Sequence, residues 1–122
     1  MELPLDSSYL TTARLFAAAA SRQIGLEEET VEDLKLAISE ACTGAINAML
    51  PGVEGAVQLS VLVADGRVTF RLETDDPIAF GSASPNTDGT GLEVTQALFD
   101  DARVEATATG GSAISFSVPL PR

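Results

Sequence analysis

The segment from Leu36 to Asn47 holds the residue types and spacing best suited to chemistry. At the helical period of about 3.6 residues, Glu40, Thr43, Gly44 and Asn47 fall on one stripe, beside an apolar stripe. Glu40 would then face a cleft between this helix and a loop at residues 75–91. Spacing alone favours a simpler interpretation, in which Glu40 belongs to a solvated helix face, because charged helix faces are common.

A second pattern, Asp88-Gly89-Thr90-Gly91-Leu92, stands directly before a predicted helix. Two glycines at a helix N-terminus expose backbone N–H groups and let an anion approach closely, so a phosphate could sit there. A flexible entry to the helix explains the same residues equally well.

Two further candidates are Asp75-Asp76 and Cys42. A carboxylate at the end of the strand before Asp75 could accept hydrogen bonds from a ligand amine, although acidic loop residues are common without any such role. Cys42 lies on the apolar stripe beside Ala41, and the chain has no His to act as its base. We therefore interpret Cys42 as a packing residue and not as a nucleophile.

The elements that must position these residues follow from periodicity. Leu3 and Leu5 indicate a short edge strand over residues 2–5, and Gly25 ends a helix that follows the N-cap candidates Asp6 to Ser8. A second helix begins near Glu27 and ends at Pro51-Gly52. The predicted apolar stripes of the two helices are Leu10, Ala13, Ala17, Ala20 and Ile24, and Val31, Leu34, Ile38, Ala41/Cys42, Ala45 and Met49.

The second half of the chain predicts two hairpins and one short helix. Alternating apolar residues over 57–63 and 68–72 flank Asp65-Gly66, a strong hairpin signal. After the loop at 75–90 come a short helix near 92–98 and a second hairpin, over 104–108 and 114–118, around Gly110-Gly111. Helices covering one face of a mixed, mainly antiparallel sheet give an α+β two-layer sandwich.

Composition narrows the function classes. The chain has 122 residues, 45% of them hydrophobic, which is typical of a single domain, here residues 1–122. The net charge of −11 argues against nucleic-acid binding. The absence of His and the single Cys exclude a His-ligated zinc site, a His-based triad and an internal disulfide. No apolar run reaches the roughly 20 residues of a membrane helix, so we expect a cytoplasmic protein.

The order of these motifs resembles that of the small serine kinases of bacterial partner-switching systems, which are anti-sigma factors with a histidine-kinase-like ATPase (Bergerat-type) fold. The resemblance covers nearly the whole chain. It rests on the following residues: Leu3-Pro4-Leu5, Arg14, Ile38–Ala45 with Ser39-Glu40-Ala41-Cys42-Thr43, Asp75, Gly89-Thr90-Gly91-Leu92, Gly111-Ser112 and Val118-Pro119-Leu120.

The resemblance also implies roles. Glu40 would correspond to the general base that acts on a protein serine, and Asp75 to the carboxylate that reads the adenine amine. Gly89 and Gly91 would border the phosphates, and Ser112 would complete the nucleotide site. Arg14 would contact the sigma factor, in a dimer whose sheets join. A local ion pair of Arg14, with Asp6 or a second-helix carboxylate, is the alternative.

Three departures weaken the nucleotide site. The Asn that holds magnesium in the family is Gly44 here, and magnesium requires oxygen donors. The family's Asp-x-Gly-x-Gly is Asp75-Asp76-Pro77-Ile78-Ala79, which loses two glycines of the adenine loop. No Lys or Arg lies between residues 72 and 102 to neutralise phosphate charge. No metal ligand is therefore predicted, ATP and magnesium are expected to bind weakly, and Glu40 is expected to be a vestigial base.

The sequence thus favours a regulatory binding protein of a partner-switching system, impaired in ATP binding and kinase activity. Its partners would be a sigma factor, an anti-anti-sigma factor or both, and a homodimer stays open. One alternative is an active serine/threonine kinase that phosphorylates an anti-anti-sigma factor, with Asn47 replacing the missing magnesium ligand. Another is a scaffold or dimerisation domain without a switching role.

Overall fold

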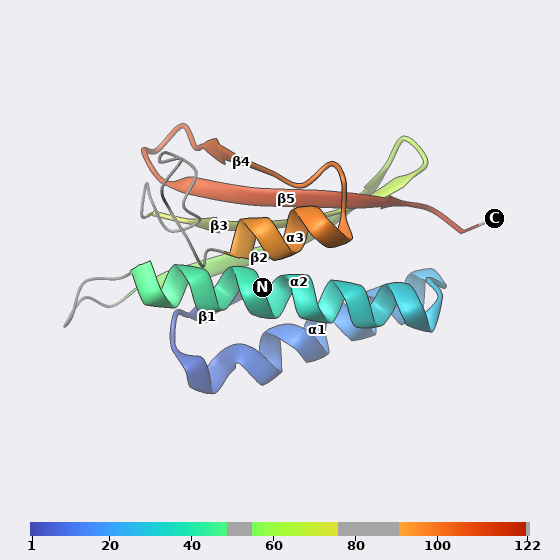
Figure 1. Cartoon of the computed structure of the whole chain (residues 1–122), viewed down its shortest axis with the longest axis horizontal. Helices are drawn as coiled ribbons and strands as arrows, with labels where there is room; N and C mark the ends of the chain where they lie inside the picture. The colour runs from blue at the N-terminus through green and yellow to red at the C-terminus, as the bar shows by residue number, and fades with distance from the viewer. Residues whose placement is uncertain (49–54, 76–90, 122) are drawn as a thin grey trace.

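The computed structural model describes residues 1–48, 55–75 and 91–121, and the side chains of Ala48 and of residues 91–94 are not described. A five-stranded sheet has the order β1-β2-β3-β5-β4, and its four strand pairs are all antiparallel. The helices lie along one side of this sheet (Figure 1), which confirms the α+β two-layer sandwich. The expected mixed sheet is wrong in one respect, because the described strands include no parallel pair. The elements are β1 (Glu2–Pro4), the 3₁₀ turn η1 (Ser7–Tyr9), α1 (Leu10–Ile24), α2 (Glu28–Ala48), β2 (Ala56–Ala64), β3 (Arg67–Thr74), α3 (Gly91–Leu98), β4 (Arg103–Ala106) and β5 (Ser112–Pro119).

The N-terminal helix begins and ends where local chemistry predicts. The Asp6 side chain accepts a hydrogen bond from the backbone N–H of Ser8 (2.9 Å) and so caps η1, the turn that precedes α1. At the other end Gly25 has φ 94°, and its N–H reaches the carbonyl of Ser21 at 3.1 Å. A left-handed glycine closes a helix in this way because it carries no Cβ.

The buried face of α1 differs slightly from the predicted stripe. Ala13 and Ala17 are buried as predicted, but Ala20 is half-buried, and Ala18 and Ser21 are buried instead. Ser21 tolerates burial because its hydroxyl donates to the carbonyl of Ala17 at 2.6 Å. The helix is therefore rotated towards Ala18 and Ser21, a detail that apolar periodicity misses because Ser21 is polar.

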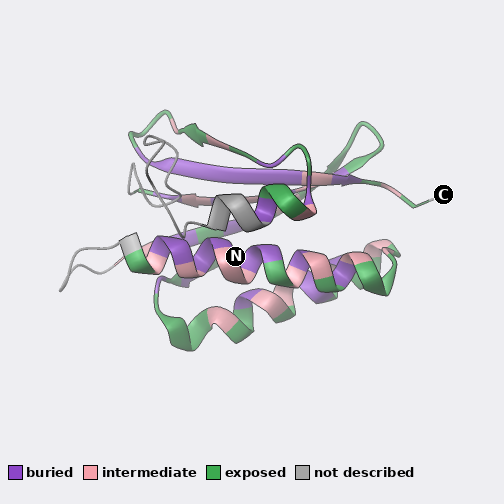
Figure 2. Ribbon diagram, in the orientation of Figure 1, coloured by how far each residue is buried: buried purple, intermediate pink, exposed green. Residues whose placement is uncertain are grey.

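Helix α2 is the centre of the core. Two glutamates, Glu28 and Glu29, occupy its first turn, where carboxylates complement the helix dipole. The predicted stripe is confirmed, and Figure 2 shows buried residues along both α2 and β5. Its fully buried members are Val31, Leu34, Ile38, Ala41 and Ala45. The predicted end at Pro51-Gly52, the predicted core residue Met49 and residues 76–90 of the predicted loop lie outside the described residues.

The two hairpins differ in how well the sequence predicts them. Asp65 (φ 54°) and Gly66 (φ 75°) form the two-residue turn between β2 and β3, as the Asp-Gly signal indicates. In the second hairpin, pairing stops at Ala106 and Ser112, and Ala108 lies in the turn and not in a strand. The turn therefore spans Thr107 to Gly111, and the N–H of Thr107 closes it by donating to the carbonyl of Gly111 at 3.0 Å.

Within the described part of the chain, no helix combines the length and apolar character needed to cross a membrane.

Candidate functional site

The stripe on α2 divides into accessible and buried positions. Glu40 and Thr43 are half-buried, Asn47 is exposed, and Gly44 is buried. The carboxylate of Glu40 has no hydrogen-bond or ion-pair partner among the described residues. Glu40 can therefore meet a ligand, whereas residues 76–90, expected to form the opposite wall of the cleft, fall outside the described chain.

Two segments far apart in sequence meet where β3 ends. Thr74, the last residue of β3, pairs in register with Ser112, the first residue of β5. Asp75 follows immediately and is exposed, whereas Ser112 is buried. Antiparallel pairing of β3 with β5 thus brings together two of the predicted site residues, Asp75 and Ser112.

A hollow of about 230 Å³ adjoins Asp75. Its lining residues come from β1, β2 and the end of β3: Glu2, Ala56, Gln58, Glu73, Thr74 and Asp75. Three of these six residues are carboxylates, and none is a cation. Glu2 and Gln58 alternate with the buried Leu3 and Val57, so the hollow lies on the face of the sheet opposite the helices. One of its carboxylates, Glu73, pairs with Arg71 at 2.9 Å.

The predicted phosphate loop is described only at its end. Gly91 is the first residue of α3, which confirms the helix expected after this motif. Gly89 lies outside the described residues.

Cys42 is 3% exposed, and burial raises the pKa of its thiol to about 12. The packing role expected for Cys42 is thereby confirmed, since a thiol with this pKa is almost wholly protonated near neutrality. No group of three or more Cys, Asp or Glu residues within the described ranges could hold a metal ion.

Arg14 lies away from Asp75, in a hollow of about 400 Å³ between α1 and α2. Its Nη2 donates to the Thr11 hydroxyl at 3.4 Å, and no carboxylate lies within ion-pair distance among the residues that the structure describes. Two exposed leucines, Leu15 (63%) and Leu36 (45%), border the hollow. The full lining is Thr11, Arg14, Leu15, Glu32, Lys35, Leu36 and Ser39.

The ion pairs proposed as the alternative for Arg14 are absent within this part of the chain. The Asp6 carboxylate accepts hydrogen bonds from the backbone and hydroxyl of Ser8. On α2, Glu28 pairs with Arg22 at 2.9 Å, and Glu32 pairs with Lys35 at 3.2 Å. Sequence reasoning singled out Arg14 but missed Leu15 and Leu36, although a leucine on the polar side of an amphipathic helix is a recognisable signal.

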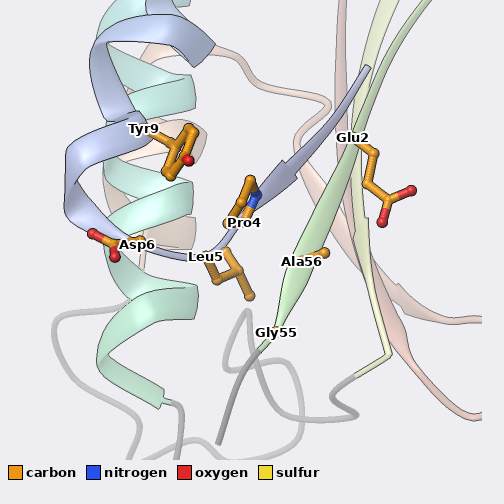
Figure 3. A pocket seen from close by; sticks show the side chains of 7 residues that line it. All are labelled: Glu2, Pro4, Leu5, Asp6, Tyr9, Gly55 and Ala56. Carbon is orange, nitrogen blue, oxygen red and sulfur yellow. The ribbon is translucent and has the colours of Figure 1, made fainter.

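A further hollow, of about 680 Å³, lies beside β1 and η1 (Figure 3). Tyr9 comes from η1 and Pro4 from β1, and the carboxylates of Glu2 and Asp6 point in opposite directions. None of the site residues predicted from the sequence lines this hollow.

Comparison with known proteins supports the fold. The family profile described as a histidine kinase-like ATPase domain matches residues 3–118. The serine-protein kinase RsbW of Bacillus pumilus is 30% identical over 126 residues, which cover 88% of this chain and 78% of that protein. Proteins with the same name from Bacillus licheniformis (30% identity, 86% and 76% coverage) and Listeria innocua (29%, 85% and 76%) are similar over comparable lengths.

Proposed function

The chain belongs to the histidine kinase-like ATPase family and is RsbW-like, and from this premise we propose that it is an anti-sigma-factor-like binding protein of a partner-switching system, impaired in ATP binding and kinase activity. Its partner is a sigma factor, an anti-anti-sigma factor or both. The proposal includes a homodimer, which sedimentation equilibrium would detect.

The observation that carries the proposal is that Arg14 has no carboxylate partner among the described residues and lines a hollow bordered by two exposed leucines. On a chain with a net charge of −11, a cation without a carboxylate partner is suited to an acidic partner surface. A guanidinium forms paired hydrogen bonds with a carboxylate, and exposed leucines supply apolar contact area beside it. Arg14, Leu15 and Leu36 together therefore support a protein-binding surface.

Two observations support impaired nucleotide chemistry. Gly44 supplies no side-chain oxygen at the position where the resembled kinases carry the Asn that holds magnesium. No Lys or Arg lies between residues 72 and 102 to neutralise the charge of the phosphates. Since phosphoryl transfer depends mainly on metal and electrostatic stabilisation, loss of both features lowers the rate of transfer.

A second candidate function is an active serine kinase that binds ATP and phosphorylates an anti-anti-sigma factor. It is favoured by the accessible Glu40, by the exposed Asn47 further along α2, and by the name serine-protein kinase that the relatives carry. Transfer of labelled phosphate from ATP to a captured partner, abolished by Glu40→Gln, would favour this candidate over the first.

The proposed function is tested by affinity capture from the native host, with tagged wild-type chain and tagged Arg14→Glu. Arg103→Glu is the matched control, because Arg103 is exposed on β4 and likewise lacks a carboxylate partner in the described chain. We expect mass spectrometry to identify a sigma factor or an anti-anti-sigma factor on the wild type and on Arg103→Glu, but not on Arg14→Glu. Recovery of neither class, or equal recovery on all three baits, contradicts the proposal.

A further inference from the structure

We infer that Gly111 is a positioning residue for Asp75: its missing side chain lets the turn before β5 rest directly on the Thr74–Asp75 backbone. A Cβ atom built on Gly111 would overlap the carbonyl oxygen of Thr74. It would also lie 2.9 Å from the Cα of Asp75 and 3.0 Å from the carbonyl carbon of Thr74. All three atoms belong to the backbone, so no side-chain rotation can relieve the contact.

Space, and not backbone conformation, makes glycine necessary at this position. Gly66 and Gly110 have φ of 75° and 88°, and a Cβ on either would meet nothing within 4 Å. Gly111 is the reverse case, since its φ lies outside the left-handed region and its Cβ position is occupied. Gly110 is therefore a suitable control, because alanine there strains the same turn without touching Asp75.

Gly111 is also held from the opposite side. Its N–H donates to the Thr107 hydroxyl at 2.9 Å, and its carbonyl accepts from the Thr107 N–H at 3.0 Å. A side chain added at position 111 must therefore either break these two bonds or displace the Thr74–Asp75 backbone.

The displacement would fall on Asp75. Thr74 and Ser112 are both buried and pair in register, so the strand is fixed just before the end of β3. Asp75 is exposed, and it borders the acidic hollow next to the strand end. The turn from Thr107 to Gly111 thus sets where the Asp75 carboxylate stands relative to that hollow.

This inference rests on the contact with the adenine amine that the family resemblance implies for Asp75, and it deepens the proposed weak ATP binding by naming what holds that carboxylate in place. Hydrogen bonds weaken steeply with distance and angle. A shift of Asp75 should therefore reduce preference for a base that carries the amine, even where the fold survives.

The test compares ATP with ITP, in which a carbonyl replaces the 6-amine of adenine. Each nucleotide is titrated without magnesium into the full chain, and NMR shifts report the two dissociation constants. We expect wild type and Gly110→Ala to prefer ATP by about tenfold, the scale of one hydrogen bond to a charged group. Asp75→Asn and Gly111→Ala should both lose most of that preference.

If Gly111→Ala keeps the wild-type ratio of the ATP and ITP dissociation constants, the inference is overturned. It is also overturned if Gly110→Ala loses as much of the preference for ATP as Gly111→Ala does. If Gly111→Ala does not fold, Thr107→Val decides: it removes the bond to the Gly111 N–H without a clash, and an unchanged ratio overturns the inference. A wild type without ATP preference also overturns it, while partner capture by Arg14 remains a separate result. Failure of partner capture with the ratios as expected contradicts the proposed function alone.

Discussion

Four of the six described cations lie within 3.9 Å of a carboxylate: Arg22, Lys35, Arg67 and Arg71. Arg14 and Arg103 have no such partner in the same part of the chain. Exposed ion pairs contribute little to stability, about 0–1 kcal/mol each. Pairing matters here mainly because a paired cation is less available to a carboxylate of a binding partner. Of these two, Arg14 is the one that lines a hollow bordered by exposed leucines, and that combination makes it the candidate contact.

Arg14→Glu should abolish partner binding, with a loss of about 2 kcal/mol or more in binding free energy if Arg14 is a hot spot. The free energy of unfolding should change by no more than about 0.5 kcal/mol, since Arg14 makes one long hydrogen bond at 3.4 Å. Calorimetric titration with the captured partner and urea unfolding measure the two quantities. Unaltered affinity, or a large stability loss, would reject the contact.

Cys42 should stay unreactive towards Ellman's reagent in the folded protein at pH 8. With a pKa of about 12, the thiolate fraction is on the order of one in ten thousand, and the side chain is 3% exposed. Reaction should therefore follow the unfolding curve when urea is added. Rapid labelling of the native protein would contradict the packing role.

Sequence reasoning at this scale succeeds for side chains whose surroundings are local. The burial of Cys42 follows from its helical stripe, and the cap at Asp6 follows from its neighbours. The requirement for glycine at Gly111 could not be predicted, because the obstructing atoms belong to Thr74 and Asp75 on another strand.

At the scale of elements, α2 combines a buried stripe with an accessible one. Substitutions on the two stripes should lower the free energy of unfolding by different amounts. Ile38→Ala should lower the free energy of unfolding by about 2–5 kcal/mol, since Ile38 is fully buried. Glu40→Ala should cost within about 1 kcal/mol, since its half-buried carboxylate has no partner in the described chain. Equal losses in chemical denaturation would contradict the assigned helix phase.

Asp101 ties the segment between α3 and β4 to β5. The N–H of Ser117 donates to Asp101 Oδ1 at 3.1 Å, the Ser117 hydroxyl donates to Oδ2, and Arg67 lies 3.9 Å away. Partial burial raises the pKa of Asp101, but these hydrogen bonds and the charge of Arg67 outweigh it, so the pKa lies below its usual value. This carboxylate therefore stabilises the fold only while it is ionised.

Because the folded-state pKa of Asp101 is lowered, its contribution is present above the unfolded value of about 3.9 and is lost as pH falls through the folded value. Asp101→Asn should therefore destabilise the protein at pH 7, and the difference from wild type should shrink below about pH 3. Urea unfolding at both pH values measures this, with Asp100→Asn as the neighbouring control. An equal difference at the two pH values would contradict the assignment.

Elements whose signals are local follow well from the sequence. The Asp65-Gly66 turn needs two adjacent positive φ values, which this residue pair adopts readily. The second hairpin is less predictable, because the Thr107 bonds to Gly111 move Ala108 out of the strand. No periodicity in the sequence encodes those bonds.

At the scale of the whole molecule, the order β1-β2-β3-β5-β4 places two surfaces apart on one fold. Pairing of β3 with β5 brings Asp75 beside Ser112, whereas Arg14 lies between α1 and α2. The layer architecture was predictable from alternating and helical periods. The meeting of Asp75 and Ser112 was expected only from family resemblance, since long-range strand pairing leaves no local signal.

The most direct test of the central claim, that nucleotide chemistry is impaired, is the free energy of unfolding with and without excess magnesium–ATP. A ligand bound at one hundred to one thousand times its dissociation constant stabilises the native state by roughly 2–4 kcal/mol. We predict a gain below about 0.5 kcal/mol that does not depend on magnesium, because Gly44 offers no metal ligand and no Lys or Arg lies between residues 72 and 102 to neutralise phosphate charge. A magnesium-dependent gain of the full size would contradict the account.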